Sequence, residues 1–222
     1  MRGRGKGDHR SGGLDLMVLG THVLDSMRYF AGAEVAWAMG YVTQDGREVT
    51  AADAHEGSEG VGRLAGNALS AYYVFQSGIN AHFELRPVPP SGSHTSSRWF
   101  GFEVHGTKGI LSLRNVSESE LYLYRHGMWL PDDAEIQWER LLLDEWENRP
   151  NSMHLSNQLI ATELIEAIEA DRDVVAASSG NDARASLEMI MAVHGSQRLH
   201  GRVEFPLKNR ENPYETRLRD QQ

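Results

Sequence analysis

A histidine near the start of the chain lies in an apolar stretch and could exchange protons with a hydroxyl group. His22 falls within "LMVLGTHVLDSMRYFAG" (16–32), and Asp25 follows three residues later. Imidazole titrates near neutral pH, which suits general acid–base catalysis. Residues three apart are neighbours on a helix, so Asp25 could orient the ring. The alternatives are a buried histidine that is hydrogen-bonded to a neighbour, and an Asp25 that pairs with Arg28.

The residues around His22 have the spacing of an amphipathic helix. Apolar residues recur at helical intervals over 14–31, and Gly32 follows in a position typical of a helix C-cap. The apolar stripe consists of Leu16, Leu19, Val23, Met27 and Phe30. A second stripe consists of Asp15, Val18, His22, Asp25 and Tyr29. Asp15 lies two turns before His22, roughly 10 Å along the axis, where it would either orient the imidazole or serve as a first-turn acid favoured by the helix dipole.

Three residues of the N-terminal segment 1–13 are candidates for binding an anionic group of a substrate. They are Lys6, His9 and Arg10, within the basic, glycine-rich "MRGRGKGDHRSGG". The alternative is a solvated basic loop. The G-x-G-x-G pattern does not predict a dinucleotide site, because such a site needs a strand before the glycines and a βαβ unit around them. We therefore predict no cofactor-binding residue in this chain.

The period of the hydrophobic pattern changes to two over residues 35–146. This alternation predicts strands at 35–42, 67–75, 79–86, 98–106, 109–114, 120–127 and 135–143. The turn sequences "QSG" and "TK" join two pairs of these strands as hairpins. Strands joined by such short connections pair antiparallel. A polar loop is expected between the first two strands.

The last predicted elements of the chain are two helices and a short strand. The helices are expected at 152–171 and 181–201, with Asn181 or Asp182 as the N-cap of the second, and the strand at 202–207. This order is typical of an α+β fold. We predict an open, predominantly antiparallel β-sheet with helices packed on one face. The expected organisation is a glycine-rich basic segment at 1–13, an α+β domain at 14–207 and a polar, frayed tail at 208–222.

Composition and charge exclude several classes of protein. The chain has 222 residues and a formal net charge of −9, so it is expected to repel nucleic acid and anionic membranes. It contains no cysteine, which excludes disulfides and cysteine-ligated metals. We recognise no membrane span of roughly 18 apolar residues and no secretion signal, so a cytoplasmic location is the expectation. An RNA-binding arm built on "RGRGKG" is a weaker alternative.

Other combinations of residues do not predict a site. His55 with Glu56, and His82 with Glu84, match no compact metal-ligand spacing, so no metal is predicted. Four aromatic residues could form a platform for a sugar ring, but aromatic residues on strands more often pack or form an interface. They are Tyr72, Tyr73, Trp99 and Trp129.

Three stretches resemble the Gfo/Idh/MocA oxidoreductases and follow the order found in that family. They are "GGLDLMVLGTHVLDSMRYFAG" (12–32), "FEVHGTKGILSL" (102–113) and "NDARASLEMIMAVHGSQRLHGRVEFPL" (181–207). The first contains the family's G-x-H-x-x-D pattern at Gly20, His22 and Asp25, and the last contains its Ser-x-Arg at Ser196 and Arg198. The resemblance covers nearly the whole chain, but only the C-terminal half of the family.

The resemblance implies an activity and partners. In that family an N-terminal Rossmann domain binds NAD(P), and the C-terminal domain supplies an open sheet that forms the substrate cleft and the oligomer interface. The helix histidine, here His22, acts as acid/base on the substrate hydroxyl, and Asp25 or Asp15 would orient it. An assisting lysine belongs to the Rossmann half. Val18 stands where many members have an aspartate, so the proton relay would differ here.

We therefore interpret the chain as the substrate-binding and oligomerisation half of an NAD(P)-dependent oxidoreductase that acts on a sugar, polyol or related hydroxy compound. A Rossmann domain in cis or in trans would hold the cofactor, and the chain alone is not expected to be active. A homo-oligomer through the sheet is expected, because an aromatic-rich antiparallel sheet would otherwise expose an apolar face. The alternative is a non-enzymatic sheet module for self-association or for binding a sugar or a protein.

Overall fold

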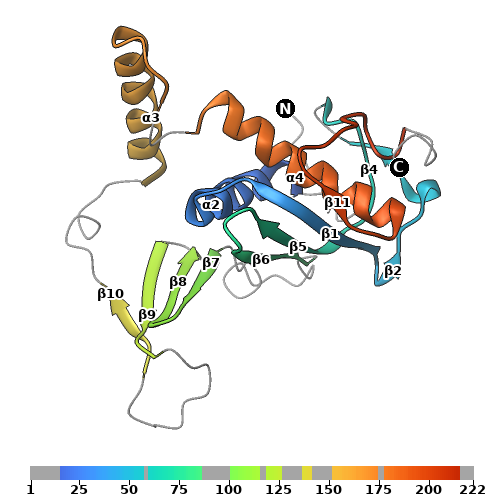
Figure 1. Cartoon of the computed structure of the whole chain (residues 1–222), viewed down its shortest axis with the longest axis horizontal. Helices are drawn as coiled ribbons and strands as arrows, with labels where there is room; N and C mark the ends of the chain where they lie inside the picture. Colours follow the sequence, from blue (N-terminus) through green and yellow to red (C-terminus); the bar gives the residue numbers. More distant parts are fainter. Residues whose placement is uncertain are drawn as a thin grey trace, which may run out of the picture. The chain divides into compact units, whose positions relative to one another are not determined.

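The chain divides into two compact units, each described here by itself. A computed structural model describes residues 16–57, 60–86, 101–115, 119–126, 137–141, 152–174 and 178–215. The first unit comprises Met1–Pro87 and Ser178–Gln222, and the second comprises Val88–Ala177. Figure 1 labels most of the helices and strands of both units.

The first unit contains an antiparallel sheet with the strand order β11-β1-β5-β6. Its strands are β1 (Val35–Gln44), β5 (Ala68–Phe75), β6 (Asn80–Leu85) and β11 (Val203–Glu204), and β2 (Arg47–Glu48) folds back on the end of β1. The pair β5–β6 is the predicted hairpin, and Gly78 has the positive φ of 85° that its turn requires. The last strand of the chain therefore lies beside the first strand of this sheet.

The loop expected between the first two strands contains short elements of its own. A 3-10 turn, η2 (Ala51–Asp53), begins with a capping box in which Thr50 and Asp53 bond to each other's backbone N–H groups. β3 (His55–Glu56) then pairs antiparallel with β4 (Arg63–Leu64). Two-residue strands fall below the length at which alternation can be recognised in a sequence, which is why the loop prediction missed them.

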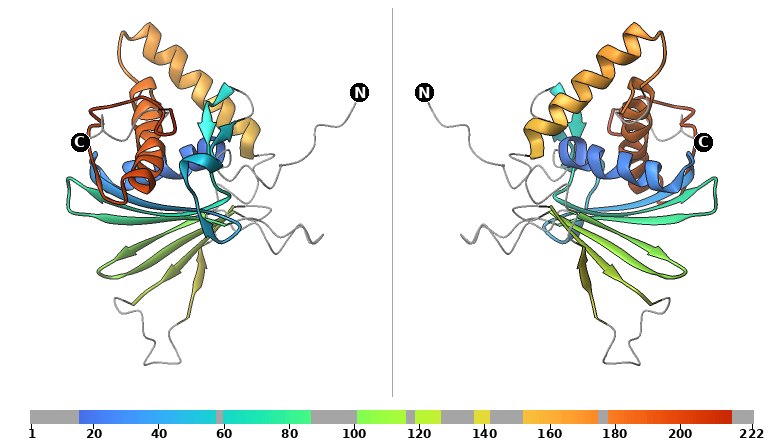
Figure 2. Two further views of the ribbon diagram at one scale, coloured as in Figure 1. Left: turned by 90° about the vertical axis from the view of Figure 1, so that its right-hand side faces the viewer. Right: turned by 90° about the vertical axis from the view of Figure 1, so that its left-hand side faces the viewer.

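Helices cover one face of the first sheet. A π-helical turn, η1 (Leu16–Gly20), leads into α2 (Thr21–Ala31), and α4 (Gly180–Leu199) precedes β11. Figure 2 shows α2 and α4 on the same side of the sheet. The core between them includes fully buried Leu24, Tyr73, Ile190 and Val193. Gly40 of β1 lets α4 approach closely, because a Cβ there would lie 2.7 Å from the Val193 side chain.

The described residues of the second unit form an antiparallel sheet and a helix. The strands are β7 (Gly101–Gly106), β8 (Gly109–Asn115), β9 (Ser119–Tyr124) and β10 (Glu139–Leu141), in the order β10-β9-β8-β7. β7 and β8 form the hairpin predicted around "TK", with Gly106 opposite Gly109. The helix α3 (Ser152–Glu169) follows in the chain, and half or more of the side-chain surface of several of its apolar residues is exposed. These residues are Leu159, Ile160, Leu164, Ile165 and Ile168.

The structure confirms the predicted fold class and shows that the apolar stripe of the first helix is only partly buried. Sheets are open and antiparallel, and helices pack on one face of the first sheet. Leu19 and Phe30 belong to the predicted apolar stripe, but each is 48% exposed. The core-facing side instead consists of Leu16, Gly20, Val23, Leu24 and Ala31. Counting only large apolar residues misplaced this face, because Gly20 and Ala31 pack against neighbours without being strongly hydrophobic.

The first part of the predicted C-terminal tail is packed rather than frayed. Tyr214 is buried, and its hydroxyl lies 3.0 Å from Nδ1 of His194 in α4. Arg210 donates to Glu188 of α4, and Asn212 donates to the carbonyl oxygen of Arg63. Aromatic burial and these hydrogen bonds hold residues 208–215 against the first unit. The polar composition of this segment did not predict its packing, because Tyr214 is a single buried aromatic residue among polar ones.

Candidate functional site

The segment that carries the candidate histidine begins with an irregular helical turn. η1 has the wide i→i+5 hydrogen bonding of a π-helix, and α2 begins immediately after Gly20. Gly20 is buried, and a Cβ at this position would lie 2.8 Å from the Leu16 side chain. π-helical turns within helices occur frequently at functional sites. The turn therefore places His22 in the first turn of a regular helix that starts from a closely packed glycine.

The side chain of His22 is exposed at the surface of α2. Its backbone carbonyl oxygen accepts a hydrogen bond from Oγ of Ser26 at 2.8 Å, but its ring makes no hydrogen bond or ion pair with another described residue. The alternative of a hydrogen-bonded core histidine is therefore wrong for this position. The ring is accessible to a ligand or to another polypeptide.

Asp25 faces the neighbouring helix α4 and is already engaged. Its Oδ1 accepts from Nη1 of Arg28 at 3.3 Å and from Oγ of Ser186 at 3.4 Å. The i,i+3 pair of Asp25 with Arg28 was one of the two alternatives for this carboxylate, and the structure contains it. No hydrogen bond links Asp25 to the imidazole of His22 within the described part of the chain. Asp25 therefore contributes to the α2–α4 contact.

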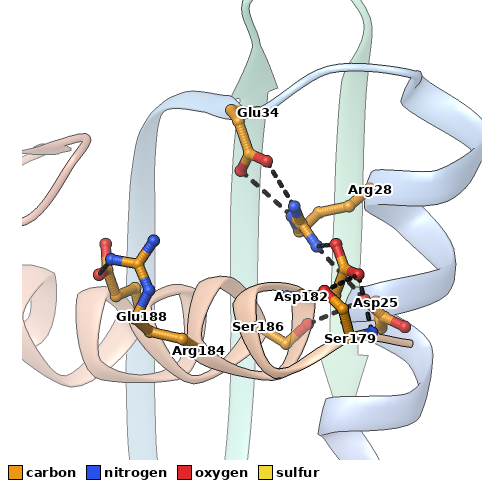
Figure 3. Close-up of polar contacts among 8 residues, drawn as sticks. All are labelled: Asp25, Arg28, Glu34, Ser179, Asp182, Arg184, Ser186 and Glu188. Carbon is orange, nitrogen blue, oxygen red and sulfur yellow. Dashed lines mark hydrogen bonds and ion pairs between the residues drawn. The ribbon is translucent and has the colours of Figure 1, made fainter. Parts of the chain in front are cut away.

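Arg28 connects three segments of the first unit. Its guanidinium donates through Nε to Glu34 at 3.2 Å and through Nη1 to Asp182 at 3.1 Å, and Nη2 forms a further bond to Glu34. The side chain is only 11% exposed. Figure 3 shows the guanidinium between the Glu34 carboxylate and the carboxylates of Asp25 and Asp182. Because several donors of one planar group are used at once, Arg28 fixes the C-terminal half of α2 relative to α4 and β1.

The first turn of α4 is fixed by a capping box that the sequence prediction placed incorrectly. Ser179 is the N-cap, and its Oγ accepts from the N–H of Asp182 while the Asp182 carboxylate accepts from the hydroxyl and the N–H of Ser179. Asn181 and Asp182 were the expected caps. The hydrogen bonds from Ser179 lower the pKa of Asp182, partial burial opposes them, and Arg28 lowers the pKa further. Asp182 therefore stays ionised as the partner of Arg28.

The Ser-x-Arg motif attaches α4 to β1 and to the C-terminal segment. Oγ of Ser196 accepts from the N–H of Gly40 at 2.8 Å and donates to the carbonyl oxygen of Gly201 at 2.6 Å. The adjacent Gln197 accepts from the N–H of Val42 at 2.8 Å. Arg198 donates to the carbonyl oxygen of Pro213. These side chains satisfy β1 backbone groups beyond the two-residue pairing with β11.

Several predicted site residues lie outside the described residues. These are Asp15, Lys6, His9 and Arg10, together with the side chain of Val18 and the aromatic residues Trp99 and Trp129. The other two aromatic candidates, Tyr72 and Tyr73, are adjacent in β5 and point to opposite faces of the sheet. Tyr73 is buried, and its hydroxyl donates to the carbonyl oxygen of Met189, whereas Tyr72 is 39% exposed on the other face. Adjacent residues of one strand cannot share a single stacking platform.

The described residues do not form a nucleotide or metal site. Every strand pair among them is antiparallel, so they contain no βαβ unit for a dinucleotide. They also contain no group of three histidine or acidic side chains close enough to hold a metal ion. None of the described helices is long and apolar enough to cross a lipid bilayer.

The fold agrees with comparisons to known proteins. The model of the C-terminal alpha/beta domain of an oxidoreductase family, Gfo/Idh/MocA, matches residues 4–205. The chain therefore belongs to this family, through its C-terminal domain. No curated protein matches the sequence.

Solved structures show the same fold at low sequence identity. Aldose-aldose oxidoreductase from Caulobacter crescentus, complexed with glycerol, is 18% identical with a TM-score of 0.59, over 90% of this chain and 52% of that one. The WlbA dehydrogenase from Bordetella pertussis, in complex with NADH and UDP-GlcNAcA, is 16% identical and has a TM-score of 0.59. The match covers 87% of this chain and 48% of the dehydrogenase. An oxidoreductase domain protein from Kribbella flavida is 19% identical and has a TM-score of 0.60. The match covers 86% of this chain and 51% of that protein. The chain spans about half the length of these proteins.

Proposed function

We propose that this chain is the substrate-binding and oligomerisation half of an NAD(P)-dependent oxidoreductase that acts on a sugar, polyol or related hydroxy compound. The observation that carries the proposal is an exposed imidazole on α2, within the G-x-H-x-x-D pattern of a family domain. Two of the related structures contain ligands, one of them glycerol and the other NADH with UDP-GlcNAcA, which supports a hydroxy compound as the substrate class.

In this proposal His22 exchanges a proton with the substrate. A neutral imidazole accepts the proton of the hydroxyl being oxidised, and in the reverse direction the imidazolium returns it to the carbonyl oxygen. The nicotinamide, held by a Rossmann domain in cis or in trans, supplies the hydride chemistry. The exposure of His22 supports this role, because the ring must contact a ligand that this domain encloses only in part.

Asp25 acts as a positioning residue in this proposal. Its bonds to Arg28 and Ser186 hold the face of α2 that carries it against α4. These contacts hold α2, which also carries His22 three residues earlier, against α4. Two further roles stay predictions. One is that Asp15 is a second acid that orients His22, and the other is that an anionic group of the substrate binds to Lys6, His9 and Arg10. A cytoplasmic location also stays a prediction.

The face of the first sheet opposite α4, here called the outer face, supports the proposed oligomer. It carries Trp37, Met39, Tyr41, Tyr72 and Val74 on β1 and β5. Met39, Tyr41 and Tyr72 are 47%, 52% and 39% exposed, and the rings of Trp37 and Tyr72 lie 5.8 Å apart. A contiguous aromatic face of this kind is typical of an interaction surface. The same face also favours the second candidate, a sheet module that only self-associates.

The test of the enzymatic proposal is the effect of His22→Ala on turnover in the chain joined to its Rossmann half. Turnover of the best substrate from a panel of aldoses and polyols should fall about 100-fold or more, because general acid–base catalysis contributes at least that much. The affinity for NAD(P)H should change little. The control is His154→Ala, which removes an exposed histidine from α3. Turnover by His22→Ala within about twofold of wild type would leave the self-associating module as the better interpretation.

A further inference from the structure

A pocket in the first unit lies between the end of α2, the start of β1 and the first turns of α4. Its volume is about 340 Å³, which is within the range of small-molecule sites. Val35, Met189 and Phe205 supply apolar surface, and Ala185 of α4 contributes a small side chain to the wall. His22 is not among the lining residues, so this pocket is separate from the candidate histidine.

At the α2 end of the pocket, carboxylates outnumber the cation that they share. Arg28 pairs with Glu34 and Asp182, which both line the pocket, and also with Asp25. The Glu34 side chain is 58% exposed, and each of its carboxylate oxygens accepts one hydrogen bond from Arg28. A carboxylate oxygen can accept a second bond. One guanidinium therefore faces three carboxylates, and this end of the pocket favours an added cation such as an ammonium group.

At the other end of the pocket the imbalance has the opposite sign. Arg184 and Arg210 both pair with the single carboxylate of Glu188. Arg184 lines the pocket, its side chain is 55% exposed, and its bond to Glu188 runs from Nη1 at 3.4 Å. A guanidinium has five N–H donors, so Arg184 can still bind a second carboxylate. This end of the pocket therefore favours an anion.

The two ends are separated along α4. Figure 3 shows the ion pairs of Arg28 displaced along this helix from the pair of Arg184 with Glu188. Glu188 follows Asp182 by six residues, which corresponds to roughly 9 Å along a helix axis. Ala185 lies between them in the sequence and lines the same pocket. A ligand that reaches both ends therefore needs a spacer several bonds long, and the wall beside that spacer is apolar.

We propose that this pocket binds a zwitterion in which an apolar spacer separates an ammonium group from a carboxylate, as in a linear ω-amino acid. The ammonium would bond to Glu34, with Asp182 adding attraction at longer range. The carboxylate would bond to Arg184, and the methylene chain would lie on Ala185 and Phe205. An extended six-carbon ω-amino acid spans roughly 7–8 Å between its charges, which suits this separation. The inference uses neither the candidate histidine nor a nucleotide, so it goes beyond the proposed function and can fail or succeed independently of it.

The test is a titration of the full chain with 6-aminohexanoate, followed by ligand-observed NMR. Saturable binding with a dissociation constant of roughly 0.5–5 mM is expected, because the charged groups of the site are partly exposed to solvent. Hexanoate and hexylamine have the same chain length but carry one charge each. Each should bind about fivefold more weakly than the zwitterion, since it can engage only one end of the pocket.

Charge-neutral variants test the two ends of the pocket separately. Glu34→Gln and Arg184→Gln should each weaken the binding of 6-aminohexanoate about fivefold, because each removes one charged partner of the ligand. The matched controls are Glu84→Gln and Arg47→Gln, which remove a charge of the same sign from ion pairs that do not line this pocket. Ala185→Trp should abolish binding by filling the pocket.

Thermal unfolding of each variant establishes that it is folded before binding is compared. The proposal is overturned if the folded wild-type chain shows no saturation up to ~50 mM 6-aminohexanoate, or if hexanoate or hexylamine binds as tightly as the zwitterion. It is also overturned if Glu34→Gln or Arg184→Gln binds 6-aminohexanoate as tightly as its matched control does. Preferred binding of the zwitterion that both changes weaken supports it.

Discussion

Arg28 of α2 donates a hydrogen bond of 3.1 Å to Asp182 of α4, a residue 154 positions away in the sequence. The contact joins the helix that carries His22 to the first turn of the helix that anchors the sheet. It also links two local features, the i,i+3 pair with Asp25 and the capping box of Ser179. An ion pair between residues far apart in the sequence therefore connects α2 to α4.

Replacing Arg28 should destabilise the first unit. In Arg28→Ala, the partly buried carboxylate of Asp182 loses its guanidinium partner, and the free energy of unfolding should fall by about 1–3 kcal/mol. Arg28→Lys should restore only part of this loss, because an ammonium group cannot bond to several carboxylates in one planar arrangement. Urea denaturation followed by circular dichroism measures the difference.

The control for Arg28 is Arg86→Ala, because Arg86 is 78% exposed and pairs with nearby Glu84 at the surface. This change should alter the free energy of unfolding by no more than about 0.5 kcal/mol. Equal effects of Arg28→Ala and Arg86→Ala would show that the connection between α2 and α4 contributes nothing measurable.

The buried His194 should make stability fall on acidification. Complete burial lowers its pKa to about 4, whereas an unfolded histidine titrates near 6.5. Between these values the unfolded chain binds the proton and the folded chain does not, so stability is full above about pH 6.5 and decreases as the pH falls toward 4. The two pKa values limit this loss to about 3 kcal/mol.

The variant His194→Gln separates this effect from that of the carboxylates. Glutamine keeps an acceptor for the Tyr214 hydroxyl but does not titrate, so the decline between about pH 6.5 and 4 should become shallower. The measurement is the free energy of unfolding of both proteins across this pH range. Parallel curves for wild type and variant would show that the ionisation of His194 is not linked to folding.

Charged substitutions on the outer face should dissociate the proposed oligomer. The double variant Met39→Glu/Tyr41→Glu places two carboxylates in an apolar surface, which an interface cannot bury without a large desolvation cost. Sedimentation velocity should show a species of lower mass than wild type. Leu187→Glu, at an exposed apolar position of α4, is the control and should leave the mass unchanged. A wild-type chain that is monomeric at micromolar concentration would remove the basis of this prediction.

The isolated chain should not bind NADH measurably. Its described strands pair only antiparallel, and its sequence contains no dinucleotide fingerprint after a strand. A fluorescence titration with NADH should show no saturation below about 100 µM, whereas the chain joined to its Rossmann half should bind in the micromolar range. Tight binding to the isolated chain would show that the nucleotide site is built from this half.

The longer helices and strands, and their order along the chain, could be predicted from the sequence alone. Helical periodicity predicted α2 and its C-cap Gly32, and alternation with turn residues predicted the hairpins β5–β6 and β7–β8. These features depend on residues within a few positions of one another, and periodicity and turn chemistry report such local relationships directly. The motif around His22 was readable for the same reason.

Which of these residues are buried, and what they contact, becomes visible only in the folded chain. Two histidines of the first unit occupy opposite environments, since His22 is exposed and His194 is 1% exposed, although both lie in helices rich in apolar residues. The partners of Arg28 and the anchoring of Tyr214 also come from distant parts of the chain. Local patterns cannot encode such contacts, because burial of a side chain depends on which element the folded chain packs over it.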